Sequence, residues 1–258
     1  MDDLIAVAED AARAAGALLL ERFGDRDALQ VSSKSTETDL VSDADHAAER
    51  CIRAILAERV PEDGILGEEG DDVASRSGRL WIVDPLDGTV NFLFGIPQWC
   101  VSVACDGEVG VIYDPLRDEL FAGARGRTTT LNGAPLGRGD PANLATALVA
   151  TGFGYDAAQR GAQGEVAAAL LPRCRDIRRA GSAALDLAWA AAGRVDAFYE
   201  HGVQRWDYAA GVVLCAGAGL EVRPLKARGL LPAGIVAAPP AIVDELSALV
   251  DGPPISPG

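Results

Sequence analysis

Two aspartates stand three residues apart in a stretch that has no basic residue to balance them. In WIVDPLDGTVNF (residues 81–92), an apolar run typical of a buried strand leads into Asp84 and Asp87. Burying one unpaired carboxylate costs several kcal/mol, and two close together cost more. A proton on one acid, a basic side chain from elsewhere in the chain, or a bound cation can offset that cost.

Two further acids have a similar setting elsewhere in the chain. Glu68 follows the apolar residues of GILGEEG (64–70), and Asp207 stands in RWDYAAG (205–211) at the start of an alanine-rich helical pattern. Several acids at the ends of apolar elements, in an acidic chain, favour the bound cation. Oxygen ligands without nearby histidine or cysteine select a hard ion, so the sequence predicts Mg²⁺, or Mn²⁺ as an ion of the same type.

The spacing of DPLD (84–87) predicts a tight turn, because its proline fixes the backbone between the two acids. Such a turn aims both carboxylates and the Leu86 carbonyl oxygen into one cavity. Gly88 permits close backbone approach, and its amide and that of Thr89 are placed to hold an anion. A cation cluster beside an anion-binding turn is the layout of a metal-dependent phosphoryl site.

The elements that position these residues change in type along the chain. Residues 2–23 and 42–60 have helical apolar periodicity, and short strands follow, with hairpin signals at 106–107 (DG) and 132–133 (NG). This predicts an N-terminal α+β half over residues 1–140, made of helices and antiparallel strands, which carries the metal-site motifs.

The remainder of the chain alternates strand and helix. Strand patterns occur at ALVATGFGY, DIRRA, VDAFYE, LEVRPL and GIVAAP, and helical patterns at EVAAALLP, SAALDLAWAAAG, WDYAAGVVLCAGAG and AIVDELSALV. This predicts a C-terminal α/β half over residues 141–250, which carries the substrate loops and the last metal ligand. Residues 251–258 are expected to be a disordered tail.

Composition limits the classes of function. The 258 residues are 49% hydrophobic, enough for a core without cross-links, and 23 basic against 38 acidic residues give a formal charge of −15. That charge repels a phosphate backbone, so nucleic-acid binding is not expected. Five cysteines without a CxxC pair indicate a reducing compartment. Without a basic leader or a long apolar run, we expect a cytoplasmic protein with no membrane partner.

Three separated motifs together resemble the inositol monophosphatase family of metal-dependent phosphatases: GEE (67–69), WIVDPLDGTVNF (81–92) and WDYAAG (206–211). DLVSDAD (39–45) and residues 181–207 fit the same pattern, and the latter stretch looks most like the bacterial inositol-1-monophosphatase branch. The resemblance covers nearly the whole chain. It implies a combined α+β and α/β fold, a layered α-β-α-β-α sandwich of the inositol monophosphatase and fructose-1,6-bisphosphatase type. It also implies a homodimer.

The resemblance implies that the four acids described above are metal ligands. Glu68, Asp84 and the Leu86 carbonyl oxygen would bind a first metal, and Asp84, Asp87 and Asp207 a second. The family holds two or three Mg²⁺ ions in each site, with the third bound weakly near Glu68. Millimolar Li⁺ is expected to inhibit such an enzyme.

Catalytic roles are also implied by the resemblance. Glu68, through the first metal, and Thr89, hydrogen-bonded to Asp45, would activate the water that attacks phosphorus in line. Lys34 would lie close to the weakly held metal. Haloacid dehalogenase-like phosphatases are a rival class that uses an aspartate as the nucleophile, but their DxDG[TV] pattern is one residue shorter. A structural Ca²⁺ site in a binding or regulatory protein is a second rival, although no EF-hand pattern is present.

The implied substrate is a small phosphorylated polyol or sugar. Asp87, Gly88, Thr89 and Asp207 would line its phosphate end, while Gly181, Ser182, Ala183 and Glu200 would hold its hydroxyl groups. FYEHG (198–202) resembles the inositol branch, so inositol-1-phosphate is the first choice. Family members that cleave fructose-1,6-bisphosphate, histidinol phosphate or nucleotide 3′-phosphates are the alternatives.

Simpler roles remain open for several of these residues. Asp45 lies in a capping-box pattern with Ser42, and Asp207 stands at a helix start, where the helix dipole favours an acid. The basic run at 173–179 suits a solvated surface better than a second anionic group of a substrate. Trp206 is expected to pack in the core. The two histidines are expected to have no direct chemistry; they are His46 and His201.

Overall fold

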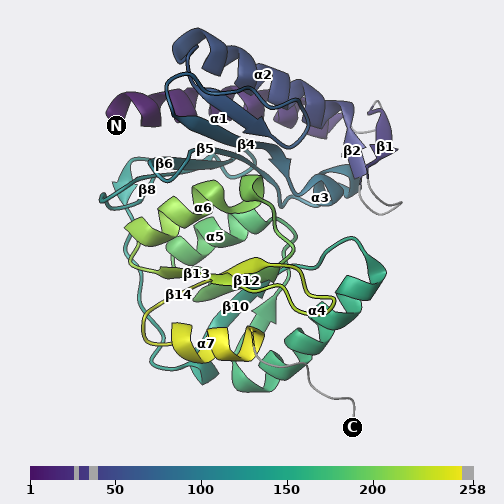
Figure 1. Cartoon of the computed structure of the whole chain (residues 1–258), viewed down its shortest axis with the longest axis vertical. Coiled ribbons are helices and arrows are strands. Elements are labelled where there is room, and N and C mark those ends of the chain that lie inside the picture. Colours follow the sequence, from purple (N-terminus) through teal and green to yellow (C-terminus); the bar gives the residue numbers. More distant parts are fainter. Residues whose placement is uncertain (26–28, 35–39, 252–258) are drawn as a thin grey trace.

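Five layers stack in the order helix, sheet, helix, sheet, helix (Figure 1). The structure is a computed structural model, which describes residues 1–25, 29–34 and 40–251. The outer helical layers are α1 and α2 on one side and α4 and α7 on the other, with α5 and α6 between the sheets. Their bounds are α1 Asp2–Gly24, α2 Asp43–Arg59, α4 Ala157–Leu170, α5 Ala183–Ala191, α6 Arg205–Gly217 and α7 Val243–Val250. The predicted layered sandwich is confirmed.

The first sheet has seven strands in the order β3-β4-β5-β6-β7-β8-β9. Both predicted hairpins are confirmed, since β5 and β6 meet at Asp106-Gly107 and β8 and β9 at Asn132-Gly133. The prediction of antiparallel strands is wrong for one pair, because β3 and β4 run parallel, with the extended segment after Gly67 carrying the chain back. The bounds are β3 Gly64–Gly67, β4 Leu80–Asp87, β5 Cys100–Cys105, β6 Val109–Asp114, β7 Glu119–Ala124, β8 Thr130–Leu131 and β9 Ala134–Pro135.

The second sheet is mixed, in the order β11-β10-β12-β14-β13. β10 runs parallel to β11 and β12, whereas β14 is antiparallel to β12 and β13. Its bounds are β10 Leu148–Thr151, β11 Asp176–Arg178, β12 Ala197–His201, β13 Glu221–Leu225 and β14 Gly234–Ala238. Short elements complete the fold: a β1–β2 pair (Val31–Ser33, Leu40–Ser42), α3 (Thr89–Phe94) and two 3₁₀ turns (Leu144–Thr146, Leu171–Arg173). Apart from Asp251, the predicted tail lies outside the described residues.

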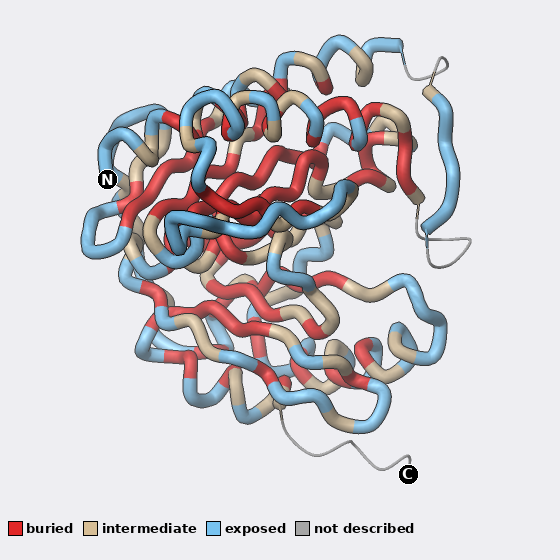
Figure 2. The backbone as a smooth tube through the Cα atoms, turned by 45° about the horizontal axis from the view of Figure 1, so that its top comes forward, coloured by how far each residue is buried: buried red, intermediate tan, exposed pale blue. Residues whose placement is uncertain are grey.

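Three apolar clusters fill the spaces between the layers. One lies between α1, α2 and the first sheet, a second surrounds α5 and α6, and the third lies under α4 and α7. Figure 2 shows the consequence, since the strands in the middle are buried while the helices at the surface expose one side. Both sheets are therefore held rigidly from two sides. None of the helices in the described ranges is both long and apolar enough to cross a membrane.

Strand β4 continues through both aspartates of DPLD, so the predicted tight turn between them is wrong. The register against β5 shifts between Asp84 and Asp87, a bulge that accommodates Pro85, which has no amide hydrogen to donate. The chain reverses one residue later, at Gly88, whose φ is 101°. A Cβ atom there would lie 2.9 Å from the Gln98 carbonyl oxygen, so the turn requires glycine.

Candidate active site

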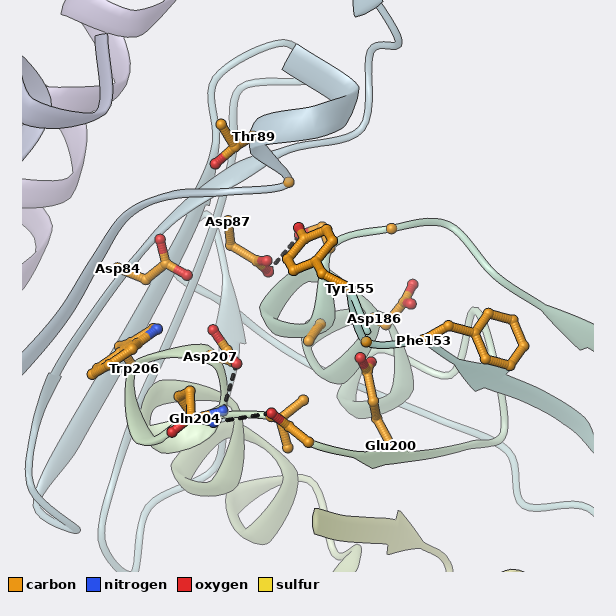
Figure 3. A pocket seen from close by; sticks show the side chains of 18 of the residues that line it. Asp84, Asp87, Thr89, Phe153, Tyr155, Asp186, Glu200, Gln204, Trp206 and Asp207 are labelled. Atoms are coloured by element: carbon orange, nitrogen blue, oxygen red, sulfur yellow. Dashed lines mark hydrogen bonds between the residues drawn. The ribbon is translucent and has the colours of Figure 1, made fainter. Parts of the chain in front are cut away.

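A cavity of 420 Å³ collects acids from both halves of the chain. Its volume is in the usual range for a small-molecule site. Figure 3 shows Asp84, Asp87 and Asp207 gathered around the cavity, with Asp186 and Glu200 on another side. The residues of the lining that the sequence predicted are Lys34, Glu68, Asp84, Leu86, Asp87, Gly88, Thr89, Gly181, Ser182, Ala183, Glu200 and Asp207. The structure therefore brings the four predicted metal-binding acids together.

Asp84 is the most enclosed of these acids, with 1% of its surface exposed. Its Oδ1 atom accepts the Leu86 amide at 3.0 Å. Burial raises the pKa of Asp84 well above its usual range, and the carboxylates of Glu68, Asp87 and Asp207 raise it further. The repulsion between these acids therefore favours a proton or a bound cation in the cavity.

A second DPL sequence in the same sheet shows what a balanced acid looks like. Asp114 ends β6 and is followed by proline and leucine, and its Oδ1 atom accepts the Leu116 amide at 3.0 Å, as Asp84 accepts that of Leu86. The fourth residue differs. It is Arg117 in this segment, whose Nη1 atom lies 2.5 Å from Asp114 Oδ2, whereas DPLD places a second acid, Asp87, there. The local fold therefore accepts a base at this position, and DPLD has an acid instead.

Asp87 and Asp207 are each held by protein donors through one carboxylate oxygen. The Ser182 hydroxyl and the Ala184 amide donate to Asp87 Oδ2 at 2.7 and 2.6 Å. The backbone amide of Gln204 donates to Asp207 Oδ2 at 2.6 Å, which completes a capping box at the start of α6. Asp207 therefore has the structural role at a helix start that its sequence position suggested, and it also lines the cavity. These bonds fix both acids in place in the wall of the cavity.

Lys34 is the base that reaches the acid cluster. Its Nζ atom lies 2.7 Å from Glu68 Oε1 and also bonds Glu69. Burial alone would lower the pKa of Lys34, but the two carboxylates outweigh it and the pKa is raised. The Glu69 side chain is 5% exposed, and burial raises its pKa to about 7, so Glu69 is not a solvated acid. Lys34 is shared between Glu68 and Glu69. The other predicted metal-binding acids have no basic partner among the described residues; they are Asp84, Asp87 and Asp207.

Asp45 divides its two oxygens between folding and the site. Oδ2 accepts the backbone amide and the hydroxyl of Ser42 at 2.9 and 2.6 Å, which forms the capping box of α2. Oδ1 lies 2.9 Å from the Thr89 hydroxyl oxygen, which is also 3.0 Å from the Leu86 carbonyl oxygen. A hydroxyl has one proton to donate, so Thr89 bonds one of these acceptors at a time. The two interpretations of Asp45 are therefore compatible.

The remaining predicted residues have mixed positions. Of the basic run at 173–179, Arg179 lines the cavity, while Arg175 and Arg178 bond neighbouring surface groups. Trp206 packs against the apolar cluster around α5 and α6 but also lines the cavity, so it is not purely a core residue. His201 is buried, and its Nδ1 and Nε2 atoms lie 2.8 and 3.1 Å from the Pro232 and Val250 carbonyl oxygens, which gives it a structural role.

The donor set suits a hard divalent cation in kind, since it offers carboxylate and carbonyl oxygens. It is not a ready-made cage, because no group of three His, Cys, Asp or Glu side chains in the described ranges is arranged to hold a metal ion. Lys34 also bonds one Glu68 oxygen that a cation would use. A cation bound among these acids would balance their charges.

Asp186 is a lining residue that the sequence analysis missed. It lies inside the apolar helix α5 and is 2% exposed. The sequence SAALDLAWAA contains a signal, because an acid in an alanine- and leucine-rich helix does not contribute to an apolar core and so indicates another role. It was overlooked because single acids on helices are usually solvated.

The raised pKa values predict how stability depends on pH in the absence of metal. Burial raises the pKa of Asp87 to about 6 and that of Glu200 to about 8. In the unfolded chain such groups titrate near pH ~4. Between these values the folded state holds more protons, so the free energy of unfolding falls as pH rises from about 4 to about 8. The loss is about 1.4 kcal/mol per pH unit for each such proton.

Thermal melting in the presence of a chelator measures this effect. The melting temperature should be lower at about pH 8 than at about pH 5.5, because the acids are then charged and unbalanced. Mg²⁺ should raise it more at the higher pH, since it binds the charged forms. A metal-free melting temperature that rises over this interval would contradict the predicted charge balance of the cavity.

The five-layer sandwich and its acid-lined cavity point to one family. The model of the inositol monophosphatase family matches residues 1–250, and the chain belongs to that family. An inositol-1-monophosphatase from Mycobacterium bovis is 44% identical over 246 residues, which cover 89% of this chain and 83% of the relative. The Nus factor SuhB of Escherichia coli K12 is 38% identical over 256 residues, 96% of each chain.

Solved structures of the same family have this fold. The extragenic suppressor protein suhB from Bartonella henselae superimposes with a TM-score of 0.89 at 36% identity, over 96% of this chain and 98% of that one. An inositol monophosphatase from Anabaena gives a TM-score of 0.83 at 34% identity, over 98% and 97%. The resemblance seen in the sequence motifs is thus confirmed along the whole chain.

Proposed function

We propose that the protein is a Mg²⁺-dependent phosphate monoester hydrolase whose preferred substrate is inositol-1-phosphate. The observation that carries the proposal is the meeting of Glu68, Asp84, Asp87 and Asp207 in one cavity, where Lys34 bonds just one of the four. Membership of the inositol monophosphatase family supports it, as does the name of the Mycobacterium bovis relative. Inositol-1-phosphate is chosen because Glu200 stands on the far side of the cavity, where hydroxyl groups need acceptors.

The residues of the chain would divide the work. When bound, Mg²⁺ would supply positive charge that attracts the phosphate and stabilises the charge developing on its oxygens. The carboxylates and the Leu86 carbonyl oxygen would hold the cations, and the amides at the Gly88 turn would orient the phosphate. Thr89, by donating its proton to Asp45 Oδ1, keeps the lone pairs of its own oxygen for a proton of the attacking water.

Phosphate release from inositol-1-phosphate tests the proposal. Activity is expected with Mg²⁺ and should be lost when a chelator removes the metal; millimolar Li⁺ should also inhibit. Activity that survives chelation would contradict a metal-dependent reaction. Acid quenching with labelled substrate separates the haloacid dehalogenase-like mechanism, because a trapped aspartyl-phosphate would show that a carboxylate, not water, attacks phosphorus.

A second candidate is a regulatory or interaction role, which the names of the Nus factor relatives favour. Two large apolar side chains at the end of α3 and just after it, Phe94 and Ile96, are 73% and 47% exposed, as a protein-contact surface would need. An experiment in cells distinguishes the phosphatase function from the interaction role. A function that persists in an Asp84→Asn variant without hydrolysis would belong to the interaction role.

A further inference from the structure

Asp186 is a buried acid to which the proposed reaction gives no task. It stands between Leu185 and Leu187 on α5 and lines the cavity. Its Oδ1 atom is buried and has no hydrogen-bond partner among the described residues. Burial raises the pKa of Asp186 well above its usual range, and the Glu200 carboxylate raises it further. A buried acceptor without a donor destabilises a fold, so this one indicates a donor that arrives with a ligand.

Glu200 belongs to the same side of the cavity. It lies on β12, across the cavity from the Asp84 cluster in Figure 3, where Asp186 is its neighbour. Its carboxylate packs against the backbone of Gly152, since a Cβ atom at position 152 would overlap it. Arg179 is a basic group that acts on both acids, which leaves this side with two acids against one base.

Two neighbouring acceptors select for a particular leaving group. Hydroxyl groups donate hydrogen bonds, and the oxygens of carboxyl groups accept them. Adjacent hydroxyls on a polyol ring offer two donors a short distance apart, which two carboxyl groups can take together. A second phosphate in this place would meet two acids and a single arginine, so it would be rejected.

We propose that Asp186 acts with Glu200 as a specificity residue that binds hydroxyl groups of the leaving group, so that the preferred substrates are monophosphates of uncharged polyols. The inference rests on the proposed phosphatase function. It places the phosphate on the Asp84 side of the cavity and the polyol on the Asp186 side. It also ranks bisphosphates, such as fructose-1,6-bisphosphate, below inositol-1-phosphate.

The test compares two substrates that share a phosphate and differ in hydroxyls. The wild-type protein with Mg²⁺ is assayed on myo-inositol 1-phosphate and on p-nitrophenyl phosphate, whose leaving group bears no further hydroxyl. In Asp186→Ala, the ratio of kcat/KM between these two substrates should fall about tenfold, the value of one hydrogen bond, mainly through a higher KM for the inositol ester. Asp186→Asn, which keeps the shape, should lower the same ratio.

Matched variants separate specificity from general damage. Asp244→Asn makes the same chemical change at a position on α7 where the side chain is 87% exposed, and it should leave the ratio unchanged. Gly152→Ala displaces Glu200 and should lower the ratio as Asp186→Ala does. Melting temperatures of both Asp186 variants should equal or exceed that of wild type, because the buried acid is removed.

The outcomes distinguish the two levels of the proposal. If the wild type hydrolyses neither ester, the proposed phosphatase function fails and this inference fails with it. If the wild type hydrolyses both and the ratio stays within about twofold in Asp186→Ala and Asp186→Asn, the phosphatase stands and the role of Asp186 is overturned. A fall in the ratio with a preserved fold supports the inference.

Discussion

Asp84→Asn is expected to lower kcat/KM for inositol-1-phosphate by about a thousandfold or more in saturating Mg²⁺. Asp84 is the acid that the other three surround, and it is the implied ligand of both metals. Charge stabilisation by a bound metal is worth several kcal/mol, and each ~1.4 kcal/mol is a factor of ten in rate. The fold should remain, because the asparagine Oδ1 atom can still accept the Leu86 amide.

Stability should change in the opposite direction to activity. Without metal, Asp84→Asn removes one buried acid from a crowded set of acids, so its melting temperature should be higher than that of the wild type. Titration with Mg²⁺ should stabilise the variant less than the wild type. A metal-free melting temperature well below that of the wild type would show that the acid supports the fold, and activity within about tenfold of the wild type would remove Asp84 from the site.

Asp114→Asn is the matched control, since Asp114 has the same sequence context and the same bond to the amide two residues on. It is fully buried but paired with Arg117. Its replacement leaves the arginine unpaired and should lower the melting temperature, with little effect on kcat/KM. If Asp84→Asn raises the melting temperature and Asp114→Asn lowers it, then Asp84 serves ligand binding and Asp114 stabilises the fold.

Local patterns were sufficient for most of the fold. The helix over Asp2–Gly24 and the one that begins after Ser42 follow from periodicity and capping, and both hairpins follow from their DG and NG turns. The DPLD segment was read wrongly because proline and aspartate favour turns in general. Pairing with β5 overrides that preference, and a bulge absorbs the proline instead. Pairing across a sheet is not visible in a local window of sequence.

The candidate site could be predicted where its residues stand at the ends of apolar elements. Asp84 and Asp207 were found in this way, and the structure adds that Asp207 also caps α6. The bond between Thr89 and Asp45 spans 44 positions, so the residues alone did not imply it and the family resemblance supplied it. Asp186 was missed because single acids on helices are usually solvated, and the effect of Glu200 on it comes from another element of the fold, which a local window does not show.

The excess of acidic residues gains a physical meaning from this arrangement. Acids outside the cavity often have a basic partner, as Glu119 has Arg194 and Asp244 has Arg223. In the cavity the acids outnumber the bases that reach them. A field of that sign attracts cations and repels a free phosphate. Substrate binding should therefore depend on the metal more strongly than the fold does.

Thr89→Ala is expected to lower kcat by about a hundredfold while leaving the Mg²⁺ concentration for half-maximal activity unchanged. The hydroxyl is placed to pass on a proton, a contribution usually worth about 10² to 10⁴ in rate. It is not a carboxylate, so its loss removes no charge that a cation needs. Thr89→Ser keeps the hydroxyl and should retain activity within about threefold. A large shift in the Mg²⁺ requirement of Thr89→Ala would make Thr89 a structural support of the cation site.

Asp45 should act through Thr89, which a double-mutant cycle can measure. Asp45 Oδ1 lies 2.9 Å from the Thr89 hydroxyl, so Asp45→Asn weakens the acceptor that orients it. The single variants and the double variant should lose similar amounts of kcat, because groups that work as a unit are not additive. Asp45 Oδ2 also caps α2 through Ser42, so melting temperatures must be recorded for each variant. Additive losses in kcat would mean that the two residues act separately and that Asp45 serves mainly the helix.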